Sequence, residues 1–114
     1  MKGCFEGIGQ WAATFACDGV KEGELVKISA NGTVAACADG DAFCGMVVSV
    51  GRDGGACAVA LGGMVTASYT GTAPAPGYVN LSANGSGGVK VDSSGVSYLA
   101  LEVDTAAKTV TIEL

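Results

Sequence analysis

The chain has 114 residues, of which 49% are hydrophobic and only 15% are charged, and its formal net charge is −5. The apolar share excludes an intrinsically disordered chain, and the length predicts a single domain. Because the six Lys and Arg residues are scattered singly along an acidic chain, we expect neither a nucleic-acid-binding face nor a polybasic membrane patch.

Residues 1–10 are predicted to form an N-terminal arm, followed by one β domain at residues 11–114. The arm has no apolar core of a secretory signal, and no apolar run approaches the ~20 residues that span a bilayer. Synthesis in the cytoplasm is therefore expected. The large apolar side chains of this region are Phe5, Ile8 and Trp11. They either cover one end of the β domain or anchor the chain on a partner, since aromatic residues supply much of the energy at interfaces.

The 19 glycines divide the remaining chain into short runs rich in Val, Ala and Thr. Val26 and Ile28 share one face of such a run, and so do Val110 and Ile112, which is the period of a half-buried strand. No segment shows the apolar period of an amphipathic helix. Strands are predicted at residues 11–17, 24–29, 33–36, 43–50, 56–61, 64–69, 78–81, 88–91, 97–103 and 109–114.

Turn signals separate these runs. Asn31-Gly32 predicts a type I′ hairpin turn, which needs positive φ at both central residues, and Gly62-Gly63 predicts another tight hairpin. Loops are predicted at residues 71–77 (with both prolines), 84–88 and 104–108. This pattern predicts an all-β fold, a single small β-barrel or sandwich of short antiparallel strands with Gly-rich turns.

The sequence offers little for catalysis. It contains no histidine, so the usual general bases of Ser/His/Asp and Cys/His systems are missing, and we expect no enzyme, no catalytic residues and no cofactor. Asp39-Gly40-Asp41 is interpreted as a solvated turn, with a weak Ca²⁺ site as the alternative; no metal site is predicted. The five cysteines, which have no CxxC spacing, are Cys4, Cys17, Cys37, Cys44 and Cys57. We expect buried free thiols, with a reactive or metal-binding thiol as the alternative.

Three segments resemble small phage and prophage capsid decoration (cement) proteins. Residues 21–34 (KEGELVKISANGTV) resemble the opening G-x-x-V and G-x-V pattern of that family. Residues 41–50 (DAFCGMVVSV) are similar to its x-x-G-V-x-x strand, and residues 59–66 (VALGGMVT) to its v-x-x-x-G-x-v hairpin. With the two closing strands, the resemblance covers residues 12–114.

The resemblance implies a compact β-barrel on the outside of an icosahedral head. It implies a structural virion protein, made in the bacterial cytoplasm, that binds the major capsid protein across the lattice and forms homo-oligomers, commonly trimers. Residues 2–10 are the segment to which the docking role of the family's N-terminal arm would transfer.

Three other functions remain open. Another virion module, from a tail or fibre, would share this composition. A small ligand-binding barrel, for instance for oligosaccharide, would need exposed aromatic residues for stacking, and the candidates are few and dispersed: Trp11, Tyr69, Tyr78 and Tyr98. An enzyme would need a carboxylate whose pKa is raised by burial.

Overall fold

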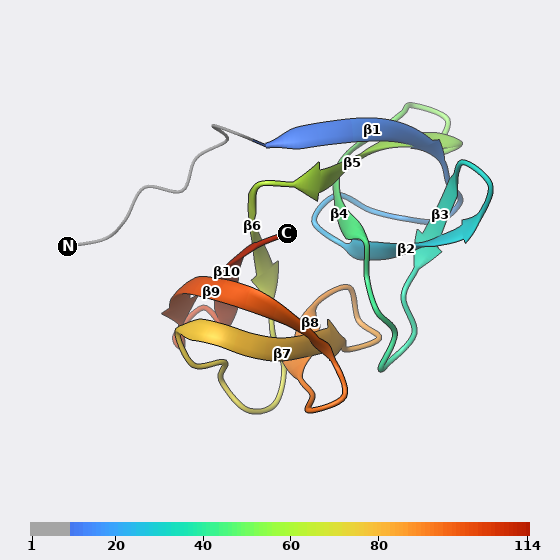
Figure 1. Cartoon of the computed structure of the whole chain (residues 1–114). Coiled ribbons are helices and arrows are strands. Elements are labelled where there is room, and N and C mark those ends of the chain that lie inside the picture. The colour runs from blue at the N-terminus through green and yellow to red at the C-terminus, as the bar shows by residue number, and fades with distance from the viewer. Residues whose placement is uncertain (1–9) are drawn as a thin grey trace.

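A computed structural model describes residues 10–114, and within them all regular structure is β (Figure 1). The ten strands of this part are β1 (Trp11–Ala16), β2 (Leu25–Ala30), β3 (Thr33–Ala36), β4 (Gly45–Val50), β5 (Ala56–Gly62), β6 (Met64–Ser68), β7 (Gly77–Ala83), β8 (Val89–Val91), β9 (Val96–Asp104) and β10 (Thr109–Glu113). The all-β prediction is confirmed.

The first five strands form a closed barrel in the order β1-β3-β2-β4-β5. Most neighbouring strands of the barrel pair antiparallel. β1 pairs with β5 from Trp11–Gly62 to Ala16–Ala56. The barrel closes where β1 meets β3 in parallel, at the pair Ala16–Thr33. The amide of Ala16 donates to the carbonyl of Gly32 there, at 2.9 Å.

The last five strands form a second sheet in the order β6-β10-β9-β7-β8, which lies below the barrel in Figure 1. Its two edges meet, because Tyr69 after β6 forms a parallel bridge to Val89 of β8. The amide of Thr70 donates to the carbonyl of Val89 at 3.1 Å. Such contact between edges reduces the exposed backbone that invites unwanted strand pairing.

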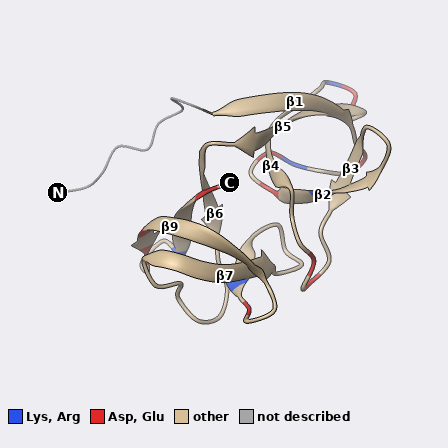
Figure 2. Ribbon diagram, in the orientation of Figure 1, with Lys and Arg blue, Asp and Glu red and all other residues tan. Residues whose placement is uncertain are grey.

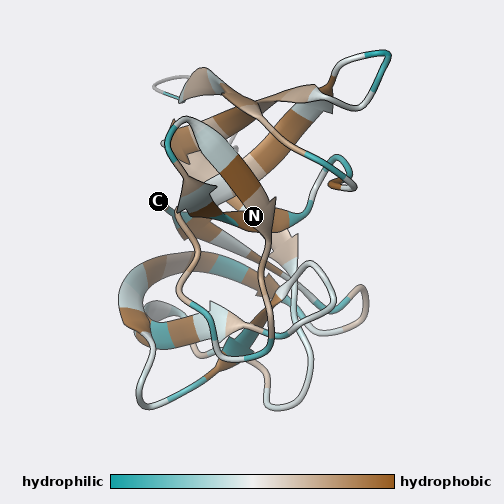
Figure 3. Ribbon diagram, turned by 90° about the vertical axis from the view of Figure 1, so that its right-hand side faces the viewer, coloured by the Kyte–Doolittle hydropathy of each residue, from teal (hydrophilic) through white to brown (hydrophobic). Residues whose placement is uncertain are grey.

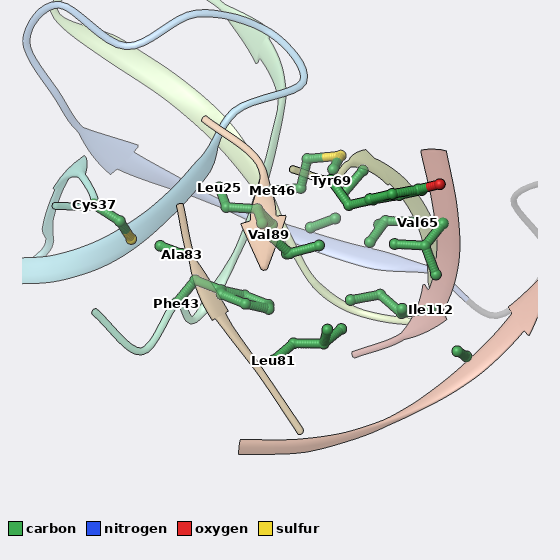
Figure 4. Close-up of a cluster of buried hydrophobic side chains, with 14 residues drawn as sticks. Leu25, Cys37, Phe43, Met46, Val65, Tyr69, Leu81, Ala83, Val89 and Ile112 are labelled. Carbon is green, nitrogen blue, oxygen red and sulfur yellow. The ribbon is translucent and has the colours of Figure 1, made fainter. Parts of the chain in front are cut away.

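The buried apolar side chains form two clusters. One fills the barrel and contains Cys17, Val20, Val26, Val34, Val47, Cys57 and Val59. The other lies between the barrel and the second sheet and includes Leu25, Met46, Leu81 and Ile112 (Figure 4). The neighbours Leu25 and Val26 belong to different clusters because side chains of a strand alternate between faces. Burial of each large aliphatic side chain contributes about 1.5–3 kcal/mol.

Backbone hydrogen bonds also join the two sheets. The amide of Gly40 donates to the carbonyl of Ala83 at 2.8 Å, and the amide of Ala83 donates to the carbonyl of Asp41 at 2.9 Å. Residues 40 and 41, in the connection between β3 and β4, therefore pair with the last residue of β7. The amide of Leu25 adds a bond to the carbonyl of Gly87 at 3.0 Å.

Each of the ten predicted strands corresponds to an observed one, with small shifts at the ends. Two turn predictions are wrong. Gly32 has a φ of 63°, but among residues 10–114 the only non-glycine residue with positive φ is Lys108, so the turn at Asn31-Gly32 is not type I′. Gly62-Gly63 does not close a hairpin, because β6 pairs with β10 of the second sheet. These two glycines form the corner where the chain leaves the barrel.

Candidate interaction surface

Trp11 is the first residue of β1, and its indole lies on the backbone of Gly62 across the strand pair. A Cβ at Gly62 would overlap the indole ring, so glycine is required for this contact. Trp11 is nevertheless 65% exposed. The neighbouring side chain of Gln10 donates to the carbonyl of Met64 at 3.2 Å. Trp11 is therefore an exposed aromatic residue on a strand that is paired with β5, beside the Gly62-Gly63 corner between the two sheets.

A second aromatic residue, Tyr78, lies at the start of β7 and is 80% exposed. It is directly opposite Leu99, which is opposite Glu113, which is opposite Met64. Directly paired residues share one face of a sheet. Tyr78 and the partly buried Leu99 and Met64 thus form a row across the outer face of the second sheet, interrupted by one carboxylate.

The strands carry few charges, and the Lys, Arg, Asp and Glu residues lie chiefly in loops and turns (Figure 2). Along several strands the colour alternates between hydrophobic and paler residues (Figure 3). Other large apolar side chains with substantial exposure in residues 10–114 are Ile28, Val48, Val91 and Val96. The sparsely charged strand faces are compatible with contact between proteins, since charged residues are depleted at interface cores.

The acidic turn at residues 39–41 is neutralised by lysines. Asp39 pairs with Lys90 at 2.9 Å, and Asp41 pairs with Lys27 at 2.6 Å. The amide of Ala38 also donates to Asp41, at 2.9 Å. The hydrogen bond from Lys27 is the main cause that lowers the pKa of Asp41. The two carboxylates serve different partners, and no group of three or more potential metal-ligating side chains occurs within residues 10–114.

The cysteines of the described part are free: Cys17, Cys37 and Cys57 are buried, and Cys44 is partly buried. Burial raises the pKa of both Cys37 and Cys57 to about 11. A thiol reacts as its thiolate, so these side chains are suited to packing rather than to nucleophilic attack. The expectation of buried free thiols is confirmed for these three residues, while Cys4 lies outside the described residues.

Asp92 is a second carboxylate held by hydrogen bonds. The hydroxyl of Ser82 donates to Asp92 at 2.8 Å. The pKa of Asp92 is lowered, first by the backbone amide of Ser94 and then by Ser82. A carboxyl group acts as a general acid near neutral pH when its pKa is raised, and Asp41 and Asp92 are shifted in the opposite direction.

No protein-family model matches the chain, and no curated protein matches it significantly. Residues 10–114 contain no helix of the length and hydrophobicity needed to cross a bilayer.

The predicted contact residues have different outcomes. Phe5 and Ile8 lie outside the described residues, so their grouping with Trp11 stays a prediction. Trp11 is exposed on a strand. Sequence reasoning named Tyr78 only as a dispersed stacking candidate and not as a partner-contact residue. A signal for its exposure was present, because Val79 and Leu81 mark the inner face of that strand and place Tyr78 on the outer face with Asn80.

Proposed function

We propose that this protein is a structural component of a phage or prophage virion that decorates the capsid by binding the major capsid protein at many equivalent lattice positions. The observation that carries the proposal is the pair of exposed aromatic residues, Trp11 and Tyr78, on ordered strands of a β fold whose strand faces carry little charge. Buried aromatic anchors supply much of the energy of a protein interface. The segments that resemble decoration proteins support the same function.

Lattice-wide binding suits such a surface. A protein present in many copies stabilises a shell through many modest contacts, because linked binding events strengthen one another. The acidic composition, with a net charge of −5, gives the chain no electrostatic attraction to packaged DNA. Self-association as a trimer is part of the proposal, since it would multiply the aromatic anchors presented to the shell.

The proposal is tested by adding the purified chain to capsid shells built from the major capsid protein of its phage. Wild-type chain should saturate the shells at a fixed ratio to the capsid protein. Truncation of a central aromatic anchor costs about 2 kcal/mol or more, so Trp11→Ala or Tyr78→Ala should weaken binding by roughly tenfold or more. Thr105→Ala, in an exposed turn, is the matched control and should bind normally. Equal binding by all four chains would contradict the assignment of these anchors.

A tail or fibre module is the second candidate and is distinguished by copy number. A few copies per particle, with no saturable binding to shells, would favour it. Binding of an oligosaccharide with quenching of Trp11 fluorescence would instead favour a ligand-binding barrel, because an exposed indole can stack on a sugar ring as well as on a protein.

A further inference from the structure

Two asparagines of the chain are followed by glycine, Asn31 and Asn84, and their surroundings differ. We propose that Asn31 is a site of spontaneous deamidation whose isoaspartyl product opens the barrel between β1 and β3, while Asn84 is protected by its hydrogen bonds. The proposal does not depend on the virion function.

The reaction needs no catalyst. The backbone nitrogen of Gly32 attacks Cγ of Asn31, and the bond from Cγ to the side-chain nitrogen breaks. The proton of the attacking amide leaves with that nitrogen as ammonia, and a five-membered succinimide remains. Water then adds to one of the two ring carbonyls and gives either aspartate or isoaspartate. A following glycine favours attack because it has no Cβ to hinder it.

Asn31 is open to this reaction. Asn31 and Gly32 are both exposed in the turn between β2 and β3. The hydroxyl of Thr33 donates to the backbone carbonyl of Asn31 at 3.1 Å. Within residues 10–114 the side-chain amide of Asn31 has no hydrogen-bond partner. Its side chain is therefore free to rotate into the position for attack.

Asn84 is held by its own loop. Its Oδ1 accepts from the amides of Ser86 at 2.8 Å and Gly88 at 3.1 Å. Its Nδ2 donates to the hydroxyl of Thr70 at 3.2 Å and to the carbonyl of Val89 at 3.4 Å. Rotation of this carboxamide toward the nitrogen of Gly85 breaks these bonds. Residues 84–88 form the predicted loop between β7 and β8, and the side chain of Asn84 bonds across it.

The position of Asn31 gives the reaction a structural consequence. The carbonyl of Gly32, the next residue, accepts the hydrogen bond from Ala16. This bond accompanies Ala16–Thr33, the register pair between β1 and β3. Isoaspartate places an additional carbon in the main chain between residues 31 and 32, which displaces that carbonyl. Aspartate leaves the main chain unchanged and should preserve the closure.

Rates of deamidation test the first part. The full chain is incubated at mildly alkaline pH and sampled for peptide mapping by mass spectrometry with fragmentation that separates isoaspartate from aspartate. Deamidation at Asn31 should be faster than at Asn84 by roughly tenfold or more, because several hydrogen bonds protect Asn84. In urea the two rates should become similar. Equal rates in the folded chain, or no reaction at Asn31, would overturn the proposal.

Thiol reactivity tests the second part. The isoaspartyl fraction is separated, and alkylation of Cys17 and Cys57, both buried inside the barrel, is followed against Asn31→Asp as the control with normal main-chain length. Opening between β1 and β3 should accelerate alkylation in the isoaspartyl form alone. Equal alkylation rates would refute the structural consequence even if Asn31 deamidates.

Discussion

The rings of Phe43 and Tyr98 are stacked, with centroids 4.8 Å apart and planes inclined by only 11°. The hydroxyl of Tyr98 also donates to the backbone carbonyl of Phe43 at 3.3 Å. Phe43 precedes β4 of the barrel, whereas Tyr98 belongs to β9 of the second sheet. One aromatic pair therefore connects the two sheets.

Variants at Tyr98 should separate the stack from its hydrogen bond. Tyr98→Phe keeps the stack and should lower the free energy of unfolding by about 0.5–1.5 kcal/mol, the usual net contribution of a hydrogen bond. Tyr98→Ala also removes the aromatic contact and should cost about 3 kcal/mol or more. Urea unfolding of the three chains measures both. Equal losses in the two variants would show that the stack contributes little.

Gly45 should tolerate no side chain. A Cβ there would overlap the carbonyl oxygen of Ala60 and lie 2.8 Å from Cγ1 of Val59. Gly45→Ala should therefore destabilise the protein by about 1–3 kcal/mol or more, the cost of overpacking. Gly55→Ala is the control, because its nearest neighbour atom is an Asp53 oxygen at 3.5 Å. Thermal unfolding measures the melting temperature of both variants, and Gly45→Ala should melt at the lower temperature. Equal melting temperatures would contradict the close approach of β4 and β5.

Alkaline pH should weaken the fold through buried thiols. Burial raises the pKa of Cys37 and Cys57 from 9.0 to about 11. A raised pKa gives stability that is present below pH 9 and is lost as pH rises toward 11. The loss is on the order of 2 kcal/mol per thiol. In the double variant with Cys37→Ala and Cys57→Ala, stability from urea unfolding should depend less on pH across this window. An unchanged pH slope would contradict this account.

Acid pH should act through Asp41. The hydrogen bond from Lys27 lowers the pKa of Asp41 below 3.8. A lowered pKa gives stability that is present above the unfolded value and is lost as pH falls through the folded value. Asp41→Asn should flatten the acid limb of the stability curve below about pH 4. Lys27→Met, which removes the donor, should flatten the same limb, and a curve identical to that of the wild type in both variants would contradict the prediction.

The strands could be predicted from the sequence because their alternation is local. Val110 and Ile112 mark the buried face of β10 without knowledge of any partner. In β2 the predicted face is buried only at Val26, because Ile28 is 51% exposed. The division into two sheets could not be predicted. Gly62-Gly63 permits both a hairpin and a corner, and the choice is made by the distant strand β10, which pairs with β6.

The candidate surface was predicted only in part, because the contacts of its residues depend on which strands pair. Trp11 was identified by residue type, but its contact with Gly62 depends on the pairing of β1 with β5. Tyr78 became evident from its 80% exposure. The ion pair between Asp39 and Lys90 joins residues 51 positions apart. No local pattern indicates such a pair, whereas the Asp-Gly sequence at Asp39-Gly40 predicts the turn.

The central claim is that this chain decorates a capsid, and the most direct measurement counts it in purified particles. Quantitative mass spectrometry of density-purified virions should give one copy of the chain per major capsid subunit or per few subunits. A handful of copies per particle would contradict decoration and favour a tail or vertex component. Complete absence from the particles would contradict the virion function itself.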